Sequence, residues 1–337
     1  MIASLDFLAP WLTSLRPGAP SVAGPITLVP LLGPNSVPPI TTLGAHRDGE
    51  QIEVKEVSES GVVARVLVVN GALVPLLLLD GEELVGAKQN RLVNASILVG
   101  AGASLEIPVS CCERGRWRHV SRGFTSSGRS MPWSMKDAKH RRVSQSLKEH
   151  RGFDADQGAT WRDVDSYLRE RGVSSRSDAL SAAFDADFES LRGLRRQLFS
   201  DGPEQGQIGL AFSLRGTLLG MELFGSPALY AQAHERLLHA FFAEALDIEP
   251  GPFPTAPEPL GLARSVLSAE PSTQDSPGLG DDHRFECAQG TGFLLSWQGA
   301  PIHAAVFAGP SGRVGRASDR DERSEPRSRR WDAGTVR

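Results

Sequence analysis

The sequence contains little cysteine and no long apolar run. Only 3 of the 337 residues are cysteine, and Cys111 and Cys112 are adjacent, which does not predict a disulfide framework. The longest apolar run, residues 72–79, is strand-sized and far below the roughly 18 residues that cross a bilayer. The first six residues lack the basic start of a secretory signal and include Asp6. We therefore expect a cytoplasmic protein that has no membrane partner.

Several catalytic motifs are also missing. The chain has no Gly-Lys dipeptide, so it has no P-loop, and it has no HExxH, GxSxG or strand-borne GxGxxG pattern. Residues 112–118 fit the C-x5-R pattern of phosphatases, but no helical pattern follows them, which disfavours that chemistry. No Cys/His set has zinc spacing, and His303 is expected to be a packed strand residue. We predict no metal site, and the sequence designates no cofactor.

Charge is distributed unevenly. The formal net charge is −4, yet residues 114–151 contain eleven basic residues and two acidic ones, a local net charge of +9. Such a segment is typical of a surface that meets anions. A nucleic-acid partner is disfavoured, because the overall charge is negative and no DNA-binding motif is present.

The first half of the chain predicts strands in tandem. Apolar runs rich in Val, Ile and Leu alternate with turn signals, and Asn70-Gly71 between two of the runs predicts a hairpin. The predicted strands are residues 26–32, 52–57, 62–69, 73–79, 92–99 and 105–111. Strands that follow one another without helices favour an antiparallel β-sandwich or roll from about residue 26 to 120.

The second half predicts a helical and mixed portion that packs on this sheet, which makes the fold class α+β. A polar loop at 123–132 precedes the predicted helices, which are 134–149, 159–171, 177–199 and, from Ser226-Pro227 onward, 227–246. The predicted strands are 207–214, 217–224, 284–288, 292–297 and 302–307, with a Pro-rich linker at 248–259. We expect an N-terminal segment (1–25), one large domain (26–310) and a disordered charged tail (311–337).

The stretch DGEELVGAKQNR, residues 80–91, is the most informative. Its charges and amides crowd between two apolar strands, where their desolvation is unfavourable unless they pair or face a cavity. Two interpretations remain open. The stretch is either a surface hairpin whose charges pair with each other or the lining of a pocket for an anionic or sugar-bearing ligand.

This stretch resembles part of a known bacterial family. Residues 80–91, followed by IPVSC at 107–111 and by Glu113 and Gly115-Arg116-Trp117, resemble the domain named for its association with ADP-ribosylglycohydrolases and rhodanese-phosphatases. QIG at 207–209 and GMELF at 220–224 extend the resemblance, which covers about residues 26–307. It implies a role beside NAD and ADP-ribose processing, with glycohydrolase-type or phosphatase-type partner enzymes. Cys111, and not Cys112, occupies the family's cysteine position.

Two functional hypotheses follow. In the first, the protein binds an ADP-ribose-type or NAD-derived, nucleotide-like anion, and processing of that anion is left open. The predicted binding residues are Lys88, Gln89, Asn90, Arg91, Cys111, Arg116 and Trp117, and the candidate acids or bases are Glu82, Glu83 and Glu113. Lys88, Arg91 and Arg116 would contact phosphate, and Trp117 would stack on adenine. In the second hypothesis, the protein is a non-catalytic interaction module that scaffolds a partner enzyme. Whether the chain is an enzyme stays open.

Overall fold

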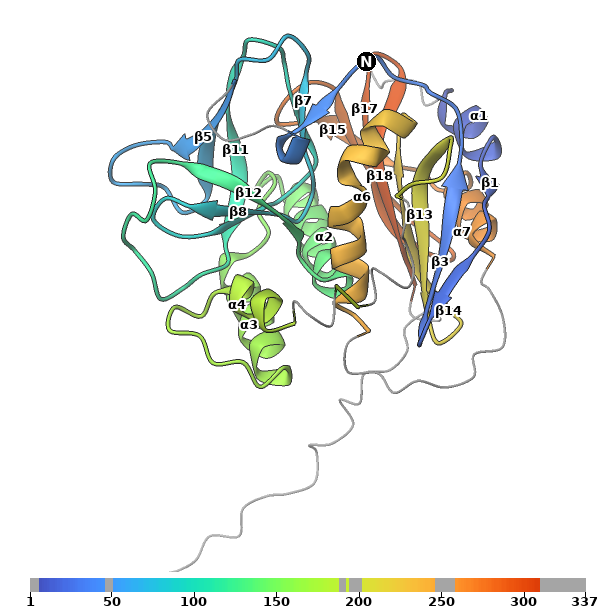
Figure 1. Ribbon diagram of the computed structural model, residues 1–337. Coiled ribbons are helices and arrows are strands. Elements are labelled where there is room, and N and C mark those ends of the chain that lie inside the picture. Colours follow the sequence, from blue (N-terminus) through green and yellow to red (C-terminus); the bar gives the residue numbers. More distant parts are fainter. Residues whose placement is uncertain (1–5, 46–50, 188–191, 194–201, 246–257, 310–337) are drawn as a thin grey trace, which may run out of the picture.

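A β-barrel and a large β-sheet stand side by side, with helices between them (Figure 1). The computed structural model describes residues 6–45, 51–187, 192–193, 202–245 and 258–309. The barrel comes from the first half of the chain, whereas most strands of the sheet come from the second half. The α+β class is therefore confirmed.

Six antiparallel strands close the barrel in the order β11-β6-β5-β12-β8-β9. They are β5 (Ile52–Glu56), β6 (Arg65–Asn70), β8 (Glu82–Gly86), β9 (Arg91–Val93), β11 (Ser104–Cys111) and β12 (Phe124–Ser130). Alternate residues of β6, Val66 and Val68, are fully buried in the barrel core together with Ile107 of β11. A three-stranded sheet lies beside it, with β4 (Thr41–Thr42), β7 (Leu76–Leu78) and β10 (Ile97–Val99); the short helix η1 (Leu43–Ala45) follows β4.

The large sheet has nine strands, in the order β1-β3-β13-β14-β18-β17-β16-β15, with β2 also paired to β3. These are β1 (Arg16–Pro17), β2 (Ser21–Ala23), β3 (Ile26–Leu32), β13 (Gln207–Leu214), β14 (Thr217–Phe224), β15 (Ser272–Asp275), β16 (Asp281–Cys287), β17 (Gly290–Trp297) and β18 (Ala300–Ala308). Both faces are covered, because Leu210 and Phe212 join one apolar cluster while Ala211 joins the other.

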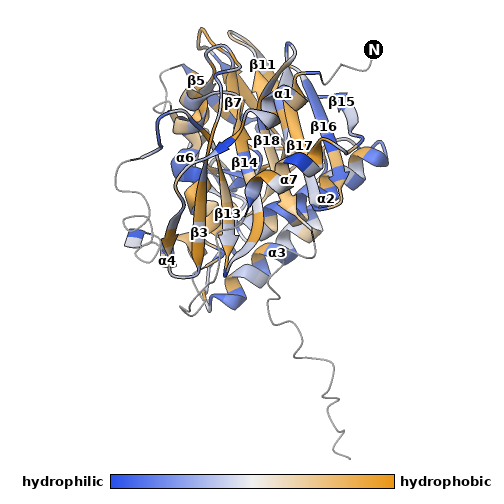
Figure 2. Cartoon of the chain, turned by 90° about the vertical axis from the view of Figure 1, so that its right-hand side faces the viewer, coloured by the Kyte–Doolittle hydropathy of each residue, from blue (hydrophilic) through white to orange (hydrophobic). Residues whose placement is uncertain are grey.

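Helices cover both faces of this sheet. The face toward the barrel packs on α6 (Pro227–Phe242) and α2 (Trp133–Lys148), and the other face packs on α1 (Leu8–Thr13) and α7 (Pro259–Val266). Figure 2, viewed from the α7 side, shows the apolar strands between these layers. Helices α3 (Gln157–Glu170) and α4 (Leu180–Ala186) pack against the N-terminal end of α2 at Met135.

The predicted sandwich or roll is corrected by this arrangement. The N-terminal half is mostly antiparallel, as expected, but it closes into a barrel instead of forming a clean sandwich. The predicted strand 26–32 leaves this unit and pairs with β13 in the sheet, for example through Leu28 opposite Phe212. Sequence pattern cannot reveal this, because the partner strand lies about 180 residues further along the chain.

The hairpin predicted at Asn70-Gly71 does not form, whereas a two-residue turn joins the predicted strands 207–214 and 217–224. Arg215-Gly216 does join β13 to β14, and both residues have positive φ, as a type I′ turn requires. The prediction of a hairpin at Asn70-Gly71 is wrong, because β6 pairs with β5 and β11 while β7 pairs with β10 and β4. The Asn70 side chain explains this outcome, since its Nδ2 donates to the carbonyls of Val74, Val99 and Gly100 and so anchors a loop.

Helix α2 confirms the predicted helix at 134–149, but its polar face is buried. Lys139 pairs with Asp80, and Lys136 Nζ lies 2.7 Å from Glu222 Oε1. Glu222 also accepts from His303 Nε2 at 2.8 Å, and His303 Nδ1 lies 2.6 Å from Ser96 Oγ. These six residues, all at most 2% exposed, form what we call the buried charged layer between barrel and sheet: Asp80, Ser96, Lys136, Lys139, Glu222 and His303.

Some predictions fall wholly or partly outside the described residues. The tail 311–337 does so entirely, as does most of the linker 248–259. Of the predicted helix 177–199, the described part contains α4. Among the helices of the described residues, none combines the length and the apolar character needed to span a membrane.

Candidate functional site

The stretch 80–91 forms the hairpin of β8 and β9. Its turn starts at Gly86 and Ala87, which both have positive φ, at 125° and 37°. A side chain at Gly86 would meet the carbonyl oxygen of Gly123 at 2.4 Å, so glycine is required for the backbone of the neighbouring loop to approach. The turn residues Lys88 and Asn90 are buried. The hairpin therefore carries its polar residues into the protein.

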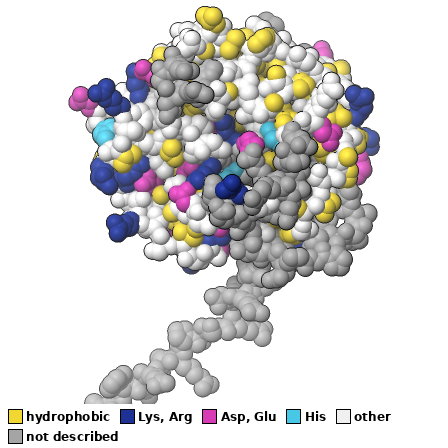
Figure 3. All heavy atoms as spheres, in the orientation of Figure 1, with side chains coloured by type: hydrophobic (Ala, Val, Ile, Leu, Met, Phe, Trp, Pro, Cys, Tyr) yellow, Lys and Arg dark blue, Asp and Glu magenta, His cyan; other side chains and the backbone are white. Residues whose placement is uncertain are grey.

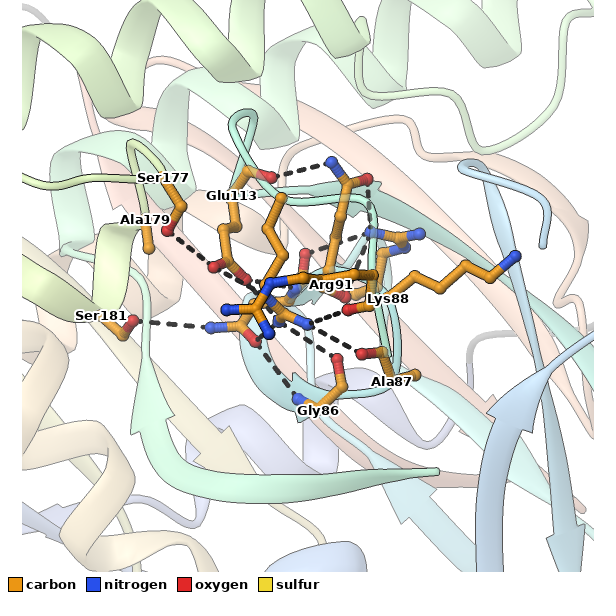
Figure 4. Close-up of polar contacts among 12 residues, drawn as sticks. Gly86, Ala87, Lys88, Arg91, Glu113, Ser177, Ala179 and Ser181 are labelled. Carbon is orange, nitrogen blue, oxygen red and sulfur yellow. Dashed lines mark hydrogen bonds and ion pairs between the residues drawn. The ribbon is translucent and has the colours of Figure 1, made fainter. Parts of the chain in front are cut away.

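Several polar contacts converge on Glu113, which Figure 4 labels, and its main partner is Arg116. Arg116 Nε donates to Glu113 Oε1 at 2.8 Å, and Arg116 Nη2 donates to Oε2 at 2.5 Å. The hydroxyl of Ser177 and the backbone amide of Asn90 also donate to this carboxylate, at 2.7 and 3.1 Å. Burial raises the pKa of Glu113, but these hydrogen bonds outweigh it and leave the pKa below its usual value.

Arg116 also ties the hairpin turn to its own loop. Its Nη1 donates to the carbonyls of Ala87 and Arg118 at 2.8 and 3.1 Å, and its Nη2 donates to Asn90 Oδ1 at 3.0 Å. With the two bonds to Glu113, the guanidinium is bound on every side by protein groups. Arg116 thus holds the loop in place.

Gln89 links the hairpin to the end of β11. Its Nε2 donates to the Glu113 carbonyl at 2.9 Å, and its Oε1 accepts from Arg91 Nη1 at 3.2 Å and lies 3.3 Å from Cys111 Sγ. The structure thus brings together six predicted residues, which we call the hairpin cluster: Gln89, Asn90, Arg91, Cys111, Glu113 and Arg116. Cys112, in contrast, places its side chain in an apolar cluster, although its backbone amide donates to the Asn90 carbonyl at 3.1 Å, and burial raises its pKa well above the usual value.

Lys88, Arg91 and Trp117 lie at the outer side of the hairpin cluster. Lys88 Nζ donates to the carbonyls of Glu59 and Ser60 at 2.5 and 2.8 Å and lies 5.3 Å from the Trp117 ring centroid. The fully buried guanidinium of Arg91 lies 6.0 Å from the same ring, and its Nε–H finds no acceptor among the described residues. The Trp117 ring is 49% exposed, so it is both supported by cations and open to solvent.

The three predicted acids occupy different environments. Glu82 is fully buried in an ion pair with Arg236 Nη1 at 2.9 Å and accepts from Ser126 Oγ at 2.7 Å. Glu113 is held by Arg116, as described above. Glu83, on the other face of β8, is fully buried, and burial raises its pKa to about 7, although Ser127 and Arg129 favour its charged form. Neither Glu82 nor Glu83 belongs to the hairpin cluster.

The segment 114–122, which we call the arginine loop, leaves the hairpin cluster for the surface. Arg118 and Arg122 are exposed, and Val120 is 58% exposed. Figure 3 shows Lys and Arg side chains on the side of the molecule where the barrel lies. Arg114 is bound at the surface by Asp165 and Asp178, at 3.2 and 3.1 Å, which fixes the start of the loop.

A groove of about 660 Å³ begins where the arginine loop ends. Ser121, Arg122 and Gly123 line one end, and the facing strands β5 and β12 form its walls. Among the described residues, these strands pair at Phe124 and Val54 alone, so they diverge beyond that point and leave the groove between them. No sequence signal predicts this groove, because the Ser/Gly-rich segment 123–132 predicts a loop and contains β12 instead.

Further functional candidates escaped the sequence analysis as well. The charge of the basic segment does not distinguish Arg118 and Arg122 from its other basic residues. Their positions close to Trp117 in sequence are the signal that could have identified them. Ser177, which supports Glu113, lies 64 residues away in sequence and carries no signal. Within the described parts of the chain, no three His, Cys, Asp or Glu residues are grouped to hold a metal ion.

The chain belongs to a recognised domain family. Residues 14–307 match the ARG and Rhodanese-Phosphatase-superfamily-associated Protein domain, which confirms the resemblance inferred from the hairpin residues. The match covers most of the chain and includes both the barrel and the large sheet. No curated protein and no solved structure matches the chain.

Proposed function

We propose that this member of the family binds a nucleotide-derived anion of the ADP-ribose type on the arginine loop and in the adjoining groove. The proposal is carried by the composition of the arginine loop. Its Trp117 side chain is exposed, and its Arg122 lines the groove. An exposed aromatic face stacks on a nucleobase, and guanidinium groups donate charge-assisted hydrogen bonds to phosphate.

In this proposal the hairpin cluster positions the loop, and the exposed arginines contact the ligand. Lys88 and Arg116 direct their hydrogen bonds to protein carbonyls and to Glu113, which leaves the phosphate contacts to Arg118 and Arg122. The groove volume of about 660 Å³ lies within the roughly 300–1,000 Å³ of small-molecule sites. Cys111 Sγ, 3.3 Å from Gln89 Oε1, helps to hold the Gln89 side chain.

If the bound anion is also processed, we assign the proton-transfer role to Glu83. Its pKa of about 7 suits a general acid or base at neutral pH, whereas Glu82 and Glu113 are held by arginine partners. Glu83 itself is fully buried and does not line the groove, whereas Ser127, which favours its charged form, does, so this role requires the ligand to reach the carboxyl past Ser127.

Calorimetric titration of the full chain with ADP-ribose, NAD and inorganic phosphate tests the binding proposal. We expect ADP-ribose to bind. Trp117→Ala should lower the affinity about tenfold to a hundredfold, because one base stacked on an aromatic ring contributes a free energy of that size. Trp117→Phe should retain most of the affinity. Arg122→Gln should weaken ADP-ribose about tenfold, as expected for a lost charge-assisted hydrogen bond.

Arg264→Gln is the matched control, because Arg264 is exposed on α7, on the far face of the large sheet. It should leave the affinity unchanged. Absence of heat with both ADP-ribose and NAD, or equal binding by the wild type and Trp117→Ala, would refute the proposal.

A second candidate function is a non-catalytic module that docks a partner enzyme. The family description, which names association with such enzymes, and the exposed Trp117 and Val120 side chains favour it. It predicts that a purified ADP-ribosylglycohydrolase-type or phosphatase-type enzyme comigrates with the chain in gel filtration. In that case Val120→Asp abolishes comigration, and no nucleotide is bound.

A further inference from the structure

The groove beside the arginine loop changes in character along its length. Its lining contains three charged residues, Glu53, Lys55 and Arg122. Lys55 Nζ lies 3.1 Å from Glu53 Oε2, so these two side chains neutralise each other on the wall formed by β5. Arg122, in contrast, is exposed and has no ion-pair partner among the described residues. The positive charge available to a ligand therefore lies at the end of the groove where the arginine loop ends.

The wall formed by β12 carries hydroxyl groups and no charge. Thr125, Ser126, Ser127 and Gly128 of this strand line the groove. The amides of Gly128 and Arg129 donate to the hydroxyls of Ser126 and Ser127, at 3.3 and 3.1 Å, in place of a neighbouring strand. Beyond its single described pairing with β5, β12 therefore presents an open strand edge, whose main chain can bind a polar, uncharged group.

The direction of one hydrogen bond shows which group this wall favours. Ser126 Oγ donates its proton to Glu82 Oε1 at 2.7 Å, and Glu82 is buried behind the wall. The Ser126 oxygen can therefore only accept a further hydrogen bond. An ionised phosphate oxygen offers no proton to such an acceptor, whereas a sugar hydroxyl does. This wall thus favours a hydroxyl-bearing group over a second phosphate.

Thr125 supplies a hydroxyl that is both free and accessible. Its side chain is half-buried in the lining of the groove, and its Oγ1 has no hydrogen-bond partner among the described residues. An unpartnered hydroxyl that is sealed in the core, such as that of Ser213, cannot meet a ligand, but Thr125 Oγ1 is not one of these sealed atoms. Thr125 follows Phe124, which pairs with β5, and so lies where the two strands separate. It therefore offers one donor and one acceptor to a ligand in the groove.

We propose that the groove beyond Arg122 is a sugar subsite, and that the ligand class of this protein is a nucleoside diphosphate that carries a terminal sugar. This inference rests on the proposed function and adds the part of the ligand that determines specificity. Arg122 binds the diphosphate at the charged end of the groove, and Thr125 binds a hydroxyl of the terminal sugar in the uncharged part. Thr125 is thereby a specificity-determining residue.

Calorimetric titration of the full chain with ADP-ribose and ADP tests the sugar subsite, because these ligands share the base and the diphosphate and differ in the terminal ribose. We expect ADP-ribose to bind about tenfold more tightly, the effect of hydrogen bonds between the ribose hydroxyls and the groove. A site for phosphate alone would give the opposite order, because the terminal phosphate of ADP carries additional negative charge.

Thr125→Val removes the hydroxyl but keeps the size and the branching of the side chain, so β12 should form as in the wild type. The variant should bind ADP-ribose about fivefold to tenfold more weakly and ADP with unchanged affinity. Thr125→Ser, which keeps the hydroxyl, should retain the affinity for ADP-ribose. Thr217→Val on β14 is the matched control and should bind both ligands as the wild type does.

The possible outcomes separate this inference from the proposed function. If ADP binds as tightly as ADP-ribose or more tightly, the sugar subsite is refuted while the nucleotide proposal stands. The same holds if Thr125→Val weakens both ligands to the same extent or weakens neither. If neither ligand binds the wild type, the nucleotide proposal fails and the sugar subsite fails with it.

Discussion

The hairpin cluster and the buried charged layer are both networks of buried polar residues, but only one of them leads to the protein surface. The charged layer is enclosed between barrel and sheet, where Lys139 meets Asp80 and Lys136 meets Glu222. The hairpin cluster lies at the outer end of the barrel and continues into the exposed arginine loop. The comparison teaches that a network of buried polar residues can serve a ligand only where it reaches solvent.

The largest expected effect comes from breaking the charged layer. Lys139→Met leaves the Asp80 carboxylate buried without its cation, which should lower the free energy of unfolding by about 3–5 kcal/mol. Urea denaturation followed by circular dichroism measures it. The double variant Asp80→Asn/Lys139→Met removes both charges and should recover part of the loss. A single variant as stable as the wild type would show that the layer does not hold barrel and sheet together.

The next effect depends on pH and concerns Glu83. Its pKa is raised from 4.5 to about 7 in the folded protein, so between these values the folded state holds a proton that the unfolded state has lost. Stability therefore falls as pH rises through this window and levels off above about 7. Glu83→Gln removes this dependence. Its free energy of unfolding should therefore rise relative to that of the wild type by about 2–3 kcal/mol between pH 4.5 and pH 8.

Urea midpoints for both proteins across this pH range measure the difference. Because other groups titrate identically in the two proteins, the difference between the curves isolates Glu83. Parallel curves would mean that Glu83 ionises normally in the folded protein, and the proton-transfer role proposed for it would then be lost.

The smallest expected effect comes from a substitution in the hairpin cluster. Glu113→Gln keeps the size of the side chain but weakens its bidentate contact with Arg116. The free energy of unfolding should fall by about 1–2 kcal/mol, a modest loss because this region borders solvent. ADP-ribose affinity should fall with it, because Arg116 no longer fixes the loop. Calorimetric Tm and titration measure the two effects, with the exposed Glu106→Gln on β11 as control. Unchanged affinity would argue against the positioning role of Arg116.

Local sequence signals predicted the elements well where the partners were also local. Ser226 caps α6 by accepting from the Leu229 amide at 3.1 Å, as its place before Pro227 predicts. β13 and β14 have the predicted bounds, because their turn and their alternation lie in one short window. The sequence predicts the hairpin cluster as a group, since all six of its members lie within the two family motifs.

The remainder depended on contacts between distant residues. The place of β3 in the large sheet is set by β13, and the burial of the polar helix α2 is set by Asp80 and Glu222. β12 was predicted as a loop because its Ser and Gly residues have low strand propensity, and pairing with β8 overrides that preference. The groove depends on β12 and could not be foreseen without it.

The divergence of β5 and β12 also has a dynamic consequence. Five residue pairs join β5 to β6, whereas Phe124 opposite Val54 is the pairing described between β5 and β12. The fewest backbone hydrogen bonds must break there, so local opening of the barrel has its lowest free energy at this junction. Amide protons of β12 should therefore exchange with deuterium before those of β6, and a molecule seated in the groove should slow that exchange.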